Sequence, residues 1–147
     1  MRRLVLLVPA LVALATLACT SAPAPAGPHR EVLAPSPSPL PVFSPAVRTG
    51  NLVFLSGQIG VRPGTLEVVS GGIVPETEQT LTNIKAVLEG IGLSMADVVK
   101  CTVFLADMRD YQAMNEVYAR FFPKDPPARS TLGANGLALG AKAEIEC

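Results

Sequence analysis

Three short segments combine residue types that could bind or transform a small molecule. The first is Pro127-Ala128-Arg129-Ser130-Thr131, in which an arginine opens an apolar stretch behind a Pro-Pro loop. An arginine in an apolar stretch is unlike an ordinary charge on a solvent-exposed strand face. Its planar guanidinium can bind both oxygens of a carboxylate. The alternative is a structural ion pair between Arg129 and a glutamate of the last predicted strand.

The second segment is Lys142-Ala143-Glu144-Ile145-Glu146. Side chains alternate between the two faces of a strand, so Lys142, Glu144 and Glu146 would share one face. A carboxylate near an arginine could hold and orient a water molecule. Spacing alone does not choose Glu144 over Glu146.

The third segment is Ser56-Gly57-Gln58, which interrupts an otherwise apolar strand. A glycine inside a strand often marks the close approach of a ligand or of another backbone. A β-bulge is the alternative explanation, and the sequence does not decide between the two.

These segments need a scaffold, and the apolar patterning predicts one. Strands are expected at 42–48, 52–59, 98–106, 128–132 and 141–146, with a weaker one at 65–69. A first helix starts near Pro75 and carries apolar residues at helical spacing up to Ile91. A second helix follows Asp107 as its cap, with Tyr111, Met114, Tyr118 and Phe121 as its apolar face, and ends before Pro123.

The predicted order gives an α+β fold, in which two helices cover one face of a mixed sheet. The main strands are apolar on both faces, so the other face must also be covered. Self-association would cover it, and loops are the alternative.

Composition limits the function further. Residues 42–147 carry nine Lys/Arg and eleven Asp/Glu, a net charge of −2, which leaves no electrostatic footprint for nucleic acid. No metal-ligand spacing is present, and the single histidine, His29, precedes the domain. Cys101 and Cys147 fall in apolar, strand-like surroundings. Two buried thiols are the favoured interpretation, and a disulfide is the alternative.

The first 18 residues predict a signal peptide, because Arg2 and Arg3 precede a run of fourteen mostly apolar residues that is too short to span a bilayer. The run ends at Cys19, as in bacterial lipoprotein signals, so we expect Cys19 to be lipidated. Residues 19–41, rich in Pro, Ala and Ser, would be an extended tether. A plain secretory signal cut after Ala26 is the alternative. Either one predicts an exported protein, and the first places it on the outer side of a bacterial membrane.

From Val42 to Glu146 the chain resembles the Rid family, the reactive intermediate deaminases of the RidA type. The matching stretches are NLVFLSGQIGVRPGT, QTLTNIKAVLEGIGLSMADVVKCTVFLADMRDY, MNEVYARFFP, PARSTL and KAEIE. The resemblance implies a chorismate-mutase-like domain at 42–147, assembled as a homotrimer with ligand clefts between subunits.

The resemblance also implies roles for residues. Arg129 would grip a substrate carboxylate and Glu144 would position the attacking water. The substrate-binding positions are Ser56, Gly57, Phe43, Asn115 and Thr131. Phe43 stands where bacterial members often carry a tyrosine, and Thr131 replaces a frequent cysteine.

The implied reaction is hydrolysis of a 2-imino acid, formed from an enamine, to a 2-keto acid and ammonia, with no cofactor. The alternative is a non-catalytic module that binds a small carboxylate ligand through Arg129. Export favours this alternative, because the imines that the family clears arise in the cytoplasm.

Overall fold

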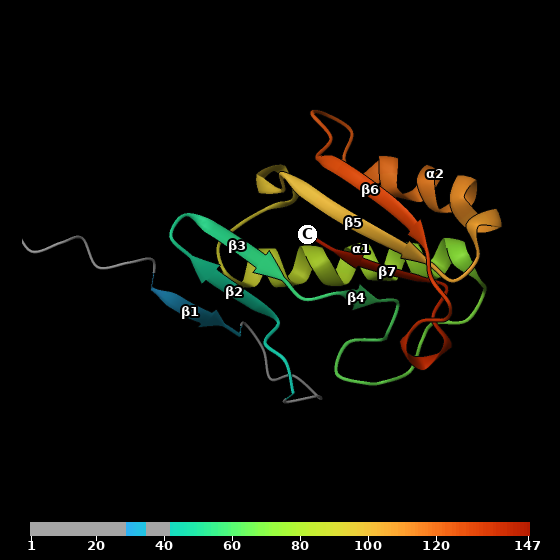
Figure 1. Ribbon diagram of the computed structural model, residues 1–147, viewed down its shortest axis with the longest axis horizontal. Coiled ribbons are helices and arrows are strands. Elements are labelled where there is room, and N and C mark those ends of the chain that lie inside the picture. The colour runs from blue at the N-terminus through green and yellow to red at the C-terminus, as the bar shows by residue number, and fades with distance from the viewer. Residues whose placement is uncertain (1–28, 35–41) are drawn as a thin grey trace, which may run out of the picture.

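The computed structural model describes residues 29–34 and 42–147 (Figure 1). The predicted signal peptide, Cys19 and most of the predicted tether lie outside the described residues. In chain order the elements are β1 (Arg30–Leu33), β2 (Ala46–Thr49), β3 (Leu52–Leu55), β4 (Gln58–Ile59), α1 (Ile73–Gly90), β5 (Lys100–Leu105), α2 (Tyr111–Phe121), β6 (Ala128–Gly133) and β7 (Ala143–Glu146). Short 3-10 helices lie at Met95–Asp97, Met108–Asp110 and Ala138–Gly140.

Two sheets organise the domain. The larger has the order β4-β7-β5-β6, with β5 and β6 parallel and the other pairs antiparallel. The smaller is the antiparallel set β1-β2-β3. The sheets meet where the Leu55 N–H donates to the Cys147 carbonyl at 2.9 Å.

Both helices pack on one face of the larger sheet, and Figure 1 shows them behind its strands. Alternation along β5 explains why, because Cys101, Val103 and Leu105 are fully buried toward the helices. The helices contribute Leu81, Ile84, Met114 and Val117 to this core. The predicted α+β fold, with two helices on one face of a mixed sheet, is confirmed.

The opposite, open face of the larger sheet is not covered by any described segment. Phe104 and Leu132 are cross-strand partners on this face, and Leu132 is 50% exposed. An exposed leucine on an otherwise uncovered sheet face is suited to contact with another protein surface.

Two predicted strands differ from the structure, and one observed strand was not predicted. The strand predicted at 52–59 is divided, because the Ser56 N–H bonds to the Pro45 carbonyl and the chain passes from one sheet to the other at Gly57. The weak strand at 65–69 reduces to one bridge between Val61 and Val68. Residues 30–33, which we expected in the tether, form β1 and pair with β2.

Both helix starts differ from the prediction by a few residues. Helix α1 begins at Ile73, so Pro75 lies in its first turn, where a missing N–H leaves no hydrogen bond unmade. Asp107 caps the 3-10 helix that precedes α2, accepting from the Arg109 N–H, and so does not cap α2 itself. Among the described residues, no helix is long and apolar enough to cross a membrane.

The expectation of two buried thiols is wrong. Cys101 and Cys147 form a disulfide, with their Cα atoms 4.1 Å apart. The register explains the pairing, because β5 and β7 run antiparallel with Thr102 opposite Glu146, which leaves Cys101 facing Cys147. Sequence spacing could not show it, because the pairing depends on how the last strand inserts into the sheet.

Candidate functional site

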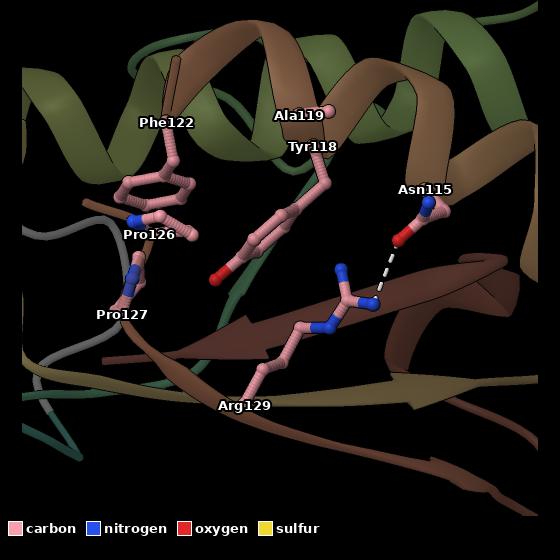
Figure 2. A pocket seen from close by; sticks show the side chains of 7 residues that line it. All are labelled: Asn115, Tyr118, Ala119, Phe122, Pro126, Pro127 and Arg129. Carbon is pink, nitrogen blue, oxygen red and sulfur yellow. Dashed lines mark hydrogen bonds between the residues drawn. The ribbon is translucent and has the colours of Figure 1, made fainter. Parts of the chain in front are cut away.

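Arg129 points from β6 toward helix α2 (Figure 2). Its Nη2 donates to the Asn115 Oδ1 at 2.7 Å and to the Tyr111 hydroxyl at 3.2 Å. It forms no salt bridge with any described residue, so the structural ion pair with a glutamate of the last strand is not observed. Its Nε and Nη1 donate to no described residue either, which leaves three N–H groups for a ligand.

Two aromatic rings flank the guanidinium. The Arg129 Cζ lies 4.5 Å from the centre of the Tyr118 ring and 5.8 Å from that of Tyr111. Both distances are within the range of cation–π attraction. The rings and Asn115 therefore fix the orientation of the guanidinium without neutralising its charge.

A cleft of about 320 Å³ opens beside Arg129, between the end of α2 and the start of β6. Its lining is mostly apolar, and Figure 2 shows the Tyr118 ring between Phe122 and Arg129. The lining residues are Asn115, Tyr118, Ala119, Phe122, Pro126, Pro127 and Arg129. A small acid with an apolar side chain matches this combination of one cation and apolar walls.

Two buried hydroxyls near Arg129, those of Tyr118 and Thr131, have no hydrogen-bond partner in the part of the chain that the structure describes. Thr131 lies two residues after Arg129 and shares its face of β6. Burial raises the pKa of the Tyr118 phenol, and the charge of Arg129 opposes this shift. The phenol therefore stays protonated and can donate a hydrogen bond.

Glu144, Gly57 and Ser56 form a second group. A Cβ placed on Gly57 would overlap the Oε1 of Glu144, so the glycine leaves room for this carboxylate. The Ser56 hydroxyl donates to the Ser44 carbonyl at 2.7 Å, which ties the strand break to the segment after Phe43. Phe43 is 46% exposed.

The pKa of Glu144 is raised from its ordinary value. Burial is the larger cause, and the nearby Glu146 carboxylate adds to it. A carboxyl group with a raised pKa is suited to accepting and returning a proton.

The two groups lie on opposite faces of the larger sheet. Arg129 is in register with Cys101, whose side chain faces the helices, whereas Glu144 is in register with Phe104 on the open face. One chain therefore brings Arg129 together with Asn115 and Thr131, and Glu144 together with Gly57 and Ser56. It does not bring Arg129 to Glu144.

Sequence reasoning missed the aromatic part of the site. It assigned Tyr111 and Tyr118 to the apolar face of the second helix, it treated Pro127 only as part of the loop before Arg129, and it gave Phe122 no role. The available signal was the one-turn spacing of Tyr111, Asn115 and Tyr118, which places them on one helix face. That face could be connected to Arg129 only once β6 was placed beside α2.

Comparison with known proteins gives the family. The model of the family described as Endoribonuclease L-PSP matches residues 34–147. The 2-iminobutanoate/2-iminopropanoate deaminase of Dermatophagoides farinae is 45% identical over 120 residues, which cover 81% of this chain and 94% of the relative. The chloroplastic Reactive Intermediate Deaminase A of Arabidopsis thaliana is 45% identical over 112 residues, which cover 76% of this chain and 60% of the relative.

The fold agrees with solved structures as well. The crystal structure of the YjgF gene product from E. coli superposes with a TM-score of 0.72 at 36% identity, covering 79% of this chain and 94% of that one. The range matched by the family model, residues 34–147, includes Arg129, Gly57 and the last strand. The chain belongs to the Rid (YjgF-like) proteins of the Endoribonuclease L-PSP family.

Proposed function

We propose that this protein hydrolyses reactive 2-imino acids, formed from enamines, to 2-keto acids and ammonia. The observation that carries the proposal is the un-neutralised guanidinium of Arg129, held by Asn115 and two tyrosines at the wall of an apolar cleft. Relatives named imine deaminases, at 39–45% identity, support this class of reaction.

The chemistry requires little beyond positioning. Arg129 holds the substrate carboxylate, and the protonated imine carbon is already electrophilic. Water adds to that carbon and gives its proton to Glu144. The proton then passes to the amino nitrogen, and the C–N bond breaks. As ammonia leaves, the hydroxyl oxygen gives up its own proton to Glu144 and becomes the carbonyl of the 2-keto acid, and Glu144 then releases that proton to ammonia or solvent. Holding the water and the substrate together supplies most of the acceleration.

We propose that the complete site lies between protomers of a homotrimer. Arg129 and Glu144 lie on opposite faces of one chain's sheet, so a second copy must supply one of them. The half-exposed Leu132 on the open face is consistent with such a contact. A closed ring of three copies would repeat the same heterologous interface.

Ribonuclease activity, which the family's description names, is a weaker proposal. Residues 42–147 carry more acidic than basic side chains, and binding of RNA depends on clustered positive charge. Non-catalytic binding of a keto or amino acid is the second candidate. Phe43 favours it, because this side chain brings no hydroxyl to the site.

A coupled assay separates these candidates. An amino-acid oxidase generates the imine in situ, and keto-acid release is measured with wild type, Arg129→Ala and Arg129→Lys. We expect Arg129→Ala to lose at least about 100-fold in kcat/KM and the lysine variant to recover only part, because it lacks the planar fork. If wild type does not accelerate hydrolysis but still binds the keto acid, the protein is a binding module.

We also propose that the domain is exported and anchored through Cys19. The disulfide supports export, because such bonds persist in oxidising compartments. In a bacterial host, Cys19→Ser should move the protein from the membrane fraction to the soluble fraction. Retention of the variant in the membrane would refute the anchor.

A further inference from the structure

The chain contains two tyrosines and no tryptophan. Both tyrosines come from α2, and both rings lie within cation–π distance of the Arg129 guanidinium. The near-ultraviolet absorbance of this protein above 275 nm therefore comes almost entirely from two tyrosines that contact the same arginine.

The two tyrosines differ in their contacts. Tyr118 is 4% exposed, and its hydroxyl has no partner among the described residues. Tyr111 is 38% exposed, and its hydroxyl accepts a hydrogen bond from the Nη2 of Arg129. Tyr118 provides the wall beneath the guanidinium, whereas Tyr111 stands at its rim, where a ligand from solvent would arrive.

The hydrogen bonds of Arg129 restrict how it can hold a carboxylate. Nη2 has two hydrogens, and its acceptors are Asn115 and Tyr111. End-on capture of a carboxylate normally uses Nη1 for one oxygen and Nη2 for the other. Here Nη1 is free among the described residues and Nη2 is engaged, so the second oxygen needs another donor.

The Tyr111 hydroxyl could donate the hydrogen bond that the second carboxylate oxygen needs. It accepts from a cation, which polarises its own O–H bond and strengthens it as a donor. Its proton is not used by any described residue. An oxygen near Nη2 would lie within reach of this proton.

We propose that Tyr111 is a substrate-binding residue whose hydroxyl donates to the carboxylate oxygen that Arg129 cannot serve. The inference rests on the proposed function, because it concerns the same bound acid. It divides recognition of the carboxylate between the guanidinium and a phenol from α2.

Tyr111→Phe tests the proposal, with 2-oxobutanoate as the probe. Loss of one charge-assisted hydrogen bond should raise the Kd by at least about tenfold. The KM should rise with little change in kcat, because the contact is the same in the ground and transition states. The melting temperature should stay near that of wild type, since Tyr111 is partly exposed.

A tyrosine difference spectrum separates ligand contact from mere positioning of Arg129. Tyr118→Phe removes the other chromophore, and 2-oxobutanoate should still perturb the remaining Tyr111 band. In Tyr111→Phe the perturbation should largely disappear. The Kd of the neutral amide of the same acid should differ less between Tyr111→Phe and wild type, because its uncharged oxygen accepts a weaker hydrogen bond than a carboxylate oxygen does.

The outcomes are distinct. An unchanged Kd in Tyr111→Phe, or a difference spectrum that comes from Tyr118 alone, would overturn the role of Tyr111 while leaving deamination in place. Wild type that neither hydrolyses imines nor binds the keto acid would overturn the proposed function, and this role with it.

Discussion

Arg129 and Glu144 are two ionisable groups with opposite kinds of surroundings. The guanidinium is surrounded by neutral acceptors and aromatic rings that orient it and leave its charge available. The carboxylate is half-buried beside a second carboxylate, so its charged form is disfavoured. The first arrangement favours binding of an anion, and the second favours proton transfer.

Glu144→Gln should lower kcat/KM by about 100-fold or more, because the variant cannot accept a proton from water. In wild type, activity should fall on the acid side with an apparent pKa above the ordinary value for glutamate, since burial raises the pKa of Glu144. A pH–rate profile in a buffer series measures this. If Glu144→Gln keeps some activity and its pH–rate profile falls on the acid side with the same apparent pKa as wild type, Glu144 is not the base.

The same substitution should not destabilise the fold. The folded-state pKa of Glu144 is raised, so its contribution to stability is present below the unfolded-chain pKa and is lost as the pH rises through the folded value. At pH 7 the ionised carboxylate therefore opposes folding, and glutamine removes that cost. The melting temperature at pH 7 should equal or exceed that of wild type.

For individual residues, the sequence predicted Arg129 as a binding group but did not predict which side chains surround it. Arg129 was identifiable because a charged side chain opens an apolar strand, and its partner Asn115 came from a family resemblance. Tyr111 looked like any aromatic residue at helical spacing. Only the tertiary contact between α2 and β6 shows that its hydroxyl meets a guanidinium.

Among the elements, the break between β3 and β4 has the clearest consequence. It places Gly57 against Glu144 and leads the chain from the small sheet into the large one. The sequence predicted one strand here, because Leu52–Ile59 is apolar apart from three positions. The break depends on hydrogen bonds to Pro45 and Cys147, which are distant in sequence.

Gly57→Ala should reduce activity strongly and stability only slightly. The added methyl would meet the end of the Glu144 side chain, which can turn away at small cost but would leave its working position. Deaminase assays and thermal unfolding measure the two effects separately.

Gly60→Ala is the matched control. Its methyl would meet the Glu76 backbone at 2.8 Å, which cannot yield easily, so we expect a loss of about 1–3 kcal/mol in unfolding free energy. Equal stability losses in the two variants would contradict the distinction between a contact with a side chain and one with the backbone.

For the whole molecule, the opposite placement of Arg129 and Glu144 predicts complementation. Arg129→Ala and Glu144→Gln should each be inactive, yet trimers assembled from an equal mixture would contain some interfaces with both native residues. In randomly assembled rings of three, roughly one interface in four joins a native Arg129 to a native Glu144, so about one quarter of wild-type activity is expected. Co-refolding of differently tagged variants tests this, and no recovery in verified mixed trimers would place both residues in one protomer's site.

The disulfide should contribute to stability, because it closes a loop with a sequence separation of 46 residues. The expected loss in Cys147→Ser is about 2–4 kcal/mol, seen as a lower melting temperature. A reductant should lower the melting temperature of wild type and leave that of Cys147→Ser unchanged. If the reductant has no effect on wild type, the bond contributes nothing to the fold.

If the proposed active site is divided between the two faces of one sheet, turnover would depend on protein concentration. When the protein concentration falls below the dissociation constant of the trimer, the chains would separate. Activity would then be lost, although every domain stayed folded. Secretion into a large volume would then abolish the proposed activity. A tether that confines many copies to a surface would keep them concentrated enough to meet.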